Sequence, residues 1–337
     1  MKTGLARHAL AALLLLSSLP LLAQTPQLDV SVAAIKGHRR VVIAEFGVEF
    51  FTQIAAASQR GAVGASMTTR LQGVDGADFQ AIADKAYADT VAALKRAGFE
   101  VLDPAVLQDN ATYRELDAQY GHPSPYLNED KHMGVDAQIS EIYAPTGMRA
   151  FYQSSLKIAE GRGSVRKNID AQNQGRAKKE GEVAKALDAA LLHVHYLAAY
   201  GQPNKRSHNA LFSGSTARAR VKVAPMLWAD DTELQFVTEA GGRTFGNGRM
   251  RHNGWVALDD ALTSDADLFA TADTTSAAMK RGNGIAAAIG LLTGSGGAQK
   301  SGTSAVTPAS ADAYREVFGG LISEAANAFA GKLGSGL

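Results

Sequence analysis

The residues of this chain whose type and spacing could bind a metal ion are His193 and His195, which one residue separates. In an α-helix two such side chains would lie about 200° apart and could not share an ion. In a β-strand they would lie on one face, roughly 6.6 Å apart. Zinc needs at least a third protein ligand, and no other histidine stands at a recognisable ligand spacing; the candidates are His122, His132, His208 and His252. We therefore predict that His193 and His195 are partly covered side chains on one strand face, with a metal site as the alternative, and we predict no cofactor.

The sequence offers no other pattern typical of an enzyme. The chain has no cysteine, and the residues around Ser66 and Ser213 do not fit the G-x-S-x-G pattern of a nucleophilic serine. The glycine-rich stretch 245–249 lacks the other positions of a dinucleotide fingerprint. The acid pairs at 230–231 and 259–260 suit turns and helix caps better than acid–base chemistry. We predict a non-enzymatic protein, and the alternatives are a metal-dependent hydrolase centred on the two histidines and a small-molecule binding module.

The first 23 residues have the composition of a cleavable secretory signal peptide. Lys2 and Arg7 precede an apolar run that ends at Ala23 and is shorter than the ~20 residues of a membrane-spanning helix. We predict cleavage before Gln24, a linker over 24–37, and a periplasmic or otherwise exported protein. Because the chain has no cysteine, disulfide bonds and a lipid anchor on an N-terminal cysteine are not expected.

The net charge of the chain argues against a nucleic-acid partner. The full sequence has 34 Lys and Arg against 33 Asp and Glu, and the predicted signal peptide contains two of the basic residues and none of the acidic ones. A nucleic-acid-binding surface needs an excess of basic side chains. The basic run between 161 and 181 is more typical of a solvated helix face or a loop.

The two histidines are predicted to lie on a strand that follows a helix. Residues 178–187 suit a helix, and the alternation of β-forming residues from 191 to 200 is typical of a strand, which would end at Gly201-Gln202-Pro203. One face of this strand would carry Leu191, His193, His195 and Leu197, and the other would carry Leu192, Val194, Tyr196, Ala198 and Tyr200.

The remaining elements follow from hydrophobic periodicity and from helix start and stop signals. We predict strands at 41–46 and 99–102, helices at 78–97, from 103 to about 120 and at 311–333, and a hairpin at 218–236. One face of the hairpin would be basic, formed by Arg218, Arg220 and Lys222. Residues 52–76 are predicted to be a loop or insertion with a short helix, and 254–283 to be short helices or turns. The apolar stretch 284–294 is predicted to be a buried or disordered insertion, with contact to a membrane or a partner as the alternative.

This order of elements predicts an α/β fold of the layered α+β kind, with helices packed on a mixed β-sheet. Residues 38–337 would form a single domain with loop-rich insertions at about 120–180 and 280–307 and a C-terminal packing helix. The strand at 41–46, the helix after it and the stretch 98–103 resemble the opening of the CsgG-like and TolB-N-terminal-like periplasmic domains. Residues 187–192 are similar to the entry of that family into its next strand, and 221–236 to its two-stranded hairpin.

The resemblance implies a non-enzymatic periplasmic or envelope protein that acts in envelope assembly or secretion, by oligomerising or by docking partners. The expected partners are other envelope proteins and further copies of the chain, with peripheral contact to the outer membrane as a further alternative. Arg218, Arg220 and Lys222 are the predicted partner-binding residues.

Overall fold

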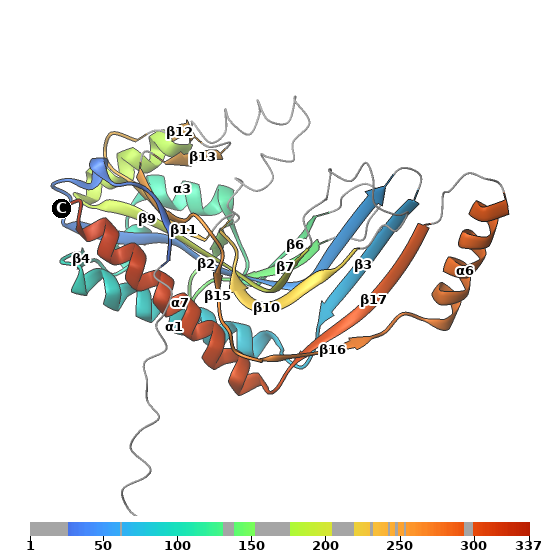
Figure 1. Ribbon diagram of the computed structural model, residues 1–337. Helices are drawn as coiled ribbons and strands as arrows, with labels where there is room; N and C mark the ends of the chain where they lie inside the picture. The colour runs from blue at the N-terminus through green and yellow to red at the C-terminus, as the bar shows by residue number, and fades with distance from the viewer. Residues whose placement is uncertain are drawn as a thin grey trace, which may run out of the picture.

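The computed structural model describes residues 26–60, 63–130, 138–151, 176–203, 219–229, 232–241, 243–246, 249–252, 254–292 and 299–337. In this part of the chain, helices pack on a mixed β-sheet, which confirms the predicted α/β fold class (Figure 1). The predicted signal peptide lies outside the described residues. The predicted linker is partly structured, because it contains strand β1 (Leu28–Ser31) and a short 3₁₀ helix, η1 (Ala33–Ile35).

Two long strands, β2 (Arg40–Arg60) and β9 (Ala190–Pro203), form the centre of the sheet and pair in parallel over most of β9. Strand β4 (Glu100–Val101) pairs with the start of β2, and the hairpin of β6 (Tyr126–Asp130) and β7 (Gln138–Tyr143) pairs with its middle. On the other side of β9 lie β10 (Val221–Leu227) and β11 (Glu233–Val237). Strand β14 (Gly254–Leu258) pairs with β11 and β1, and β15 (Leu262–Thr263) pairs with β10.

Helices α1 (Gly76–Arg96) and α7 (Ala311–Gly334) lie side by side on one face of the sheet (Figure 1). Both were predicted, and both begin at a cap: Asp75 accepts the N–H groups of Ala77 and Asp78, and the Ser310 hydroxyl accepts that of Ala313. Their apolar sides pack on alternate residues of β2 and β9, including Phe50, whose ring stacks on that of Phe79 at 4.5 Å. This layer contains the largest apolar cluster of the described residues.

A smaller cluster covers the opposite face near the start of β2. It is formed by the helix at 176–187, by α2 (Ala105–Gln108) and by α3 (Ala111–Tyr120). The single helix predicted from 103 to about 120 is therefore two helices. The break lies at Asn110, which is extended and whose side chain caps α3 by accepting the Tyr113 N–H.

Three strands leave this helix-covered body together and form what we call the arm: the outer part of β2 (residues 54–60), β3 (Val63–Leu71) and β17 (Gln299–Pro308) (Figure 1). The prediction of a loop or insertion at 52–76 was wrong, because β2 continues to Arg60 and returns as β3. The loop-rich insertion predicted at 280–307 was wrong as well, because it contains β17 and most of helix α6 (Ala277–Leu292). Strand β16 (Phe269–Asp273) pairs with the inner end of β17.

The predicted hairpin at 218–236 does not form. Strands β10 and β11 do not pair with each other; both pair with β9, one with its second half and the other with its first half. Both ends of the segment between them keep contact with β9. The backbone N–H of Trp228 donates to the Leu197 carbonyl, and the Thr232 hydroxyl accepts the Leu197 N–H. The chain therefore continues along β9 instead of turning back.

Several predicted loops contain strands. The region 120–180 includes β6 and β7 and the short pair β5 (Gly121–His122) and β8 (Ala150–Phe151), and the segment 254–273 holds β14, β15 and β16 where short helices or turns were predicted. Strands β12 (Arg243–Gly246) and β13 (Arg249–His252) form a separate pair. Among the described residues, no helix combines the length and apolar character needed to cross a membrane.

Candidate functional site

The acidic and histidine side chains of the sheet gather on the face opposite α1 and α7. An extra residue in β2 places them there: Ile43 pairs with Leu192 and Glu45 with His193, so that Ala44 is a bulge. The bulge shifts the alternation of side chains by one residue, and Phe46 faces the same apolar core as Ile43. Glu45 consequently lies on the face that carries the histidines.

His193 belongs to a buried ionic cluster with Glu45, Arg176 and Glu180. Its Nδ1 lies 3.4 Å from a Glu45 oxygen, and its Nε2 lies 3.6 Å from Oε1 of Glu180. The Arg176 guanidinium contacts both carboxylates, with Nε 2.7 Å from the same Glu180 oxygen and Nη2 against Glu45. Each of the four residues is at most 6% exposed, so the guanidinium and the two carboxylates have been removed from water and depend on one another.

Arg176 is held in place by aromatic rings as well as by charge. Its guanidinium carbon lies 5.0 Å from the centre of the Tyr120 ring and 5.7 Å from that of Phe151. Cation–π contacts of this kind are strongest where water is excluded. The rings come from α3 and β8, so Arg176 links the helix at 176–187 to two further elements.

His195 lies in a second buried cluster, with Glu49, Ser140 and Asn128. Its Nε2 lies 3.3 Å from Oε2 of Glu49. The other oxygen of Glu49 accepts hydrogen bonds from the Ser140 hydroxyl and, at 3.2 Å, from the Asn128 amide. Burial raises the pKa of Glu49, but the hydrogen bond and charge of His195, together with Ser140 and Asn128, hold this pKa below its usual value. Gly47 pairs with His195 and leaves room for its ring, because a Cβ there would lie 3.4 Å from that ring and 3.0 Å from Ile142.

A metal ion is not required to explain the histidines. Ligand atoms of Glu45, Glu180 and His193 do lie within 4.8 Å of one another and could hold an ion. Arg176, however, already brings a positive charge to both carboxylates. The predicted strand face is confirmed, but the side chains are buried at 2% exposure each and not partly covered.

The other histidines considered as third ligands lie elsewhere. His122 stacks on Tyr126 at 4.4 Å, and His252 belongs to β13. His132 and His208 lie outside the described residues. Sequence reasoning missed the acidic partners, although Glu45 and Glu49 interrupt the apolar run of β2 four residues apart, a pattern that indicates buried carboxylates in need of partners.

Two of the three predicted partner-binding residues can be placed. Arg220 is exposed just before β10 and Lys222 is exposed within it, while Arg218 lies outside the described residues. Lys222 pairs with Gln202 near the end of β9, and neither Arg220 nor Lys222 lies on a hairpin. Their role in binding a partner stays a prediction.

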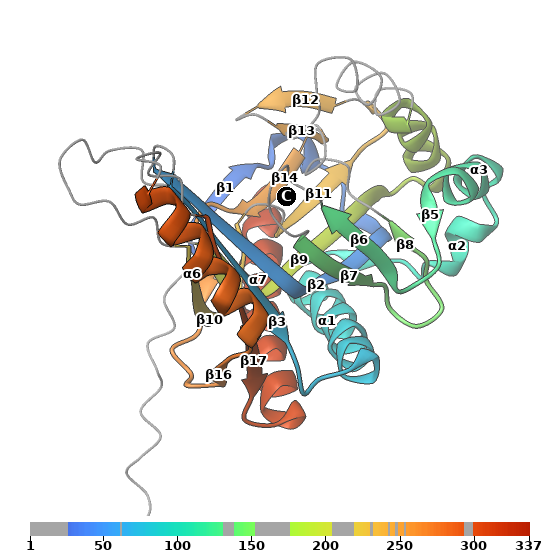
Figure 2. The same ribbon diagram turned by 90° about the vertical axis from the view of Figure 1, so that its right-hand side faces the viewer.

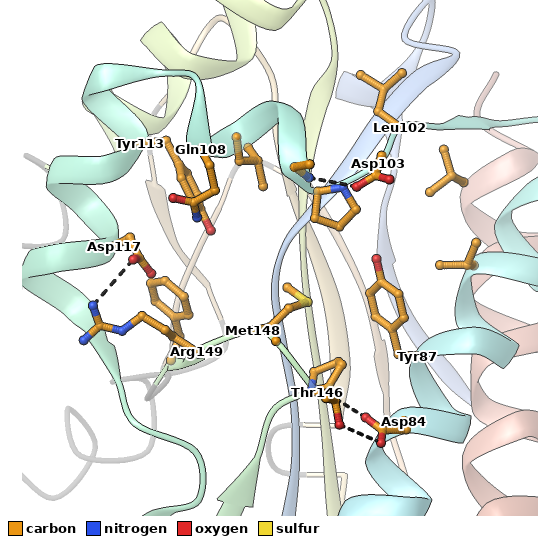
Figure 3. A pocket seen from close by; sticks show the side chains of 18 of the residues that line it. Asp84, Tyr87, Leu102, Asp103, Gln108, Tyr113, Asp117, Thr146, Met148 and Arg149 are labelled. Atoms are coloured by element: carbon orange, nitrogen blue, oxygen red, sulfur yellow. Dashed lines mark hydrogen bonds and ion pairs between the residues drawn. The ribbon is translucent and has the colours of Figure 1, made fainter.

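A hollow of about 950 Å³ lies between α1, α2, α3 and the turn before β8 (Figure 3). Met148 and Leu102 contribute apolar surface, and Tyr87 directs its hydroxyl toward Asp103 (Figure 3). Burial and, to a smaller extent, the charge of Asp103 raise the pKa of Tyr87. The ionic side chains of the wall are three acids and two bases: Asp84, Asp103, Asp117, Lys95 and Arg149.

Comparison of the chain with protein-family models gave no match, and comparisons with curated proteins and with solved structures gave none. The resemblance to the CsgG-like and TolB-N-terminal-like domains therefore stays a prediction. The proposals below depend on the geometry of the described residues.

Proposed function

We propose that the protein is a non-enzymatic envelope protein that assembles with further copies of itself through the arm. The envelope location depends on the predicted signal peptide. The assembly depends on the construction of the arm, whose inner part is covered by the body but whose outer part is partly exposed on both faces. Consecutive residues of a strand point to opposite faces, and residues 64–67 of β3 and 301–304 of β17 are all partly exposed. Strands that bury so little apolar surface gain stability by pairing with further strands.

A second copy suits the arm better than a partner attracted by charge. Between 54 and 71 and between 299 and 308, the charged residues are Arg60, Arg70 and Lys300. Arg70 donates a hydrogen bond to Gln53 within the same sheet at 2.7 Å. The side chains around them are mostly Ala, Gly, Ser and Thr, which permit close approach of another backbone. The groups left to hold a partner are the N–H and C=O groups of the strand edges.

The mass of the mature protein, measured by light scattering after size exclusion with and without mild detergent, tests this function. We expect a discrete assembly of several chains. Substitution Ala57→Lys should lower the assembled fraction, because a lysine on an edge strand opposes pairing. Ala118→Lys is the matched control, since Ala118 is exposed on α3 and distant in the fold from the arm. A single-chain mass at every concentration, in both buffers, would contradict the proposal.

The hollow beside α1 supports small-molecule binding as a second candidate function. Its wall combines apolar side chains with an excess of one carboxylate over bases, which suits an organic cation with an apolar ring better than an anion. We expect phenethylamine to raise the melting temperature more than 3-phenylpropionate, which carries the opposite charge on a similar body. Asp103→Asn should remove the preference, and equal effects of both compounds on the unsubstituted protein would exclude this ligand class.

A further inference from the structure

Helix α6 covers the outer edge of β17 through side chains that take the place of a neighbouring strand. Oδ1 of Asn283 accepts the N–H of Ser301 at 3.0 Å, and Nδ2 of Asn283 donates to the Ser301 carbonyl at 2.7 Å. A residue of a paired strand makes this same pair of bonds with its backbone. The amide of Asn283 therefore occupies both groups that a further strand would use at Ser301.

A side chain again takes the place of a strand's backbone two residues further along β17. The N–H of Thr303 donates to the Thr275 hydroxyl at 3.0 Å, and that hydroxyl lies 3.2 Å from the Thr303 carbonyl. The Thr274 N–H also donates to the Thr303 carbonyl, at 3.0 Å. Residues i and i+2 of a strand present their backbone groups to the same edge, so one edge of β17 is covered at both positions, directly beyond the end of its pairing with β16.

Helix α6 itself is weakly built. It contains Gly282 and Gly284, and a Cβ at either position would meet no atom within 4 Å. Glycine inside a helix lowers its stability by about 1 kcal/mol relative to alanine, and packing does not require these two. Ile285 is 62% exposed, and α6 lies beyond the body, over the arm (Figure 2). A buried or disordered insertion was predicted at 284–294; over 284–288, where the structure describes the side chains, this stretch is helical and at least partly exposed.

We propose that the edge of β17 at Ser301 and Thr303 is a docking edge for the outer part of β2 of another copy, and that α6 covers this edge until the copies meet. This inference rests on the proposed assembly function. Among the described residues, no strand pairs with the second edge of β2 beyond Gln53. Strand β3 is antiparallel to β2 and parallel to β17, so β17 runs opposite to β2. Copies in the same orientation would thus pair in the antiparallel sense, and the contact would repeat from copy to copy.

A reversible lock tests the proposal. The hydroxyl oxygens of Thr274 and Thr303 lie 3.1 Å apart, so cysteines at both positions are placed to form a disulfide, and the natural chain has no cysteine to interfere. In the double variant Thr274→Cys, Thr303→Cys, we expect oxidation to lower the assembled fraction at least tenfold and reduction to restore it. The single variant Thr274→Cys is the control for the thiol. Equal assembly of the oxidised and reduced forms would overturn the proposal.

A second measurement distinguishes two outcomes: either α6 does not cover the edge of β17, or the protein does not assemble. Asn283→Ala should raise the exchange rate of the Ser301 amide hydrogen about fivefold, the factor expected for one net hydrogen bond, and should speed assembly. Gly282→Ala with Gly284→Ala should slow assembly, because it strengthens α6. If the exchange rate of the Ser301 amide does not change in Asn283→Ala, α6 does not cover the edge of β17. If exchange rises while the wild-type protein stays a single chain in every buffer, the assembly function fails and the docking edge fails with it.

Discussion

Replacing Arg176 by methionine is expected to lower the free energy of unfolding by about 3–5 kcal/mol, the cost of removing one partner from a buried ionic group. Methionine keeps much of the apolar contact with Tyr120 and Phe151 but leaves the carboxylates of Glu45 and Glu180 without the guanidinium. Folded domains are typically stable by only about 5–15 kcal/mol, so the change is large. Urea unfolding at neutral pH, followed by circular dichroism, measures it.

Lys179→Met is the matched control for this substitution. Lys179 lies in the same helix and pairs with Glu115 at 2.9 Å, but both side chains are well exposed. Exposed pairs contribute little to stability, and we expect no measurable shift of the unfolding midpoint. If Arg176→Met were as stable as the control, the two carboxylates would not depend on the guanidinium and the cluster would have to be reinterpreted, with a metal ion on Glu45, Glu180 and His193 as the next hypothesis.

Glu49→Gln is expected to remove about 2 kcal/mol of stability at neutral pH, because hydrogen bonds to a charged group contribute about 1.5–3 kcal/mol. The loss should depend on pH. The pKa of Glu49 in the folded protein lies below the ordinary value of 4.5. The stabilising contribution of the carboxylate is therefore complete above pH 4.5 and disappears as the pH falls through the lower folded-state pKa. The difference in unfolding free energy between wild type and variant should therefore shrink from pH 7 toward pH 3.

Glu100→Gln provides the comparison for the pH series. Glu100 also lies in the central sheet, 3.6 Å from Arg40, but its side chain is 62% exposed. This variant should follow the wild-type pH curve. A Glu49→Gln deficit that stayed constant down to pH 3 would show that the loss comes from packing and not from the charge that His195, Ser140 and Asn128 surround.

The elements predicted correctly from sequence are those whose apolar side faces a single covering layer. Helix α7 shows its packing face at Tyr314, Phe318 and Phe329, and α1 has both a start and a stop signal. Strand β9 was predicted from its alternation, and its helix-facing side is apolar as expected. Local pattern was sufficient in these cases because each residue's environment follows from the period of the element.

The outer part of the arm could not be predicted in the same way, because it has no covered face to impose a period. Small residues such as those at 55–58 and 64–66 have no strong preference for strand over loop. They pair with each other, and the pairing of 64–71 with 299–306 depends on chain more than 200 residues away in sequence. The hairpin at 218–236 failed for a related reason: β9 is long enough to pair with both of its strands end to end. Arg176 was missed because its partner on β2, Glu45, comes from a distant part of the sequence.

The bulge at Ala44 determines which changes of length β2 can accept. Up to Ile43 the core-facing residues of β2 are odd-numbered, and from Phe46 to Phe50 they are even-numbered. Deleting Ala44 would leave a regular alternation in which Ile43 and Phe46 still face α1 and α7. Inserting or deleting a residue between Glu45 and Glu49 would instead turn one of these two carboxylates toward α1 and α7. Related sequences should therefore keep the number of residues between Glu45 and Glu49, while the residue at 44 can be lost without moving either carboxylate to the other face.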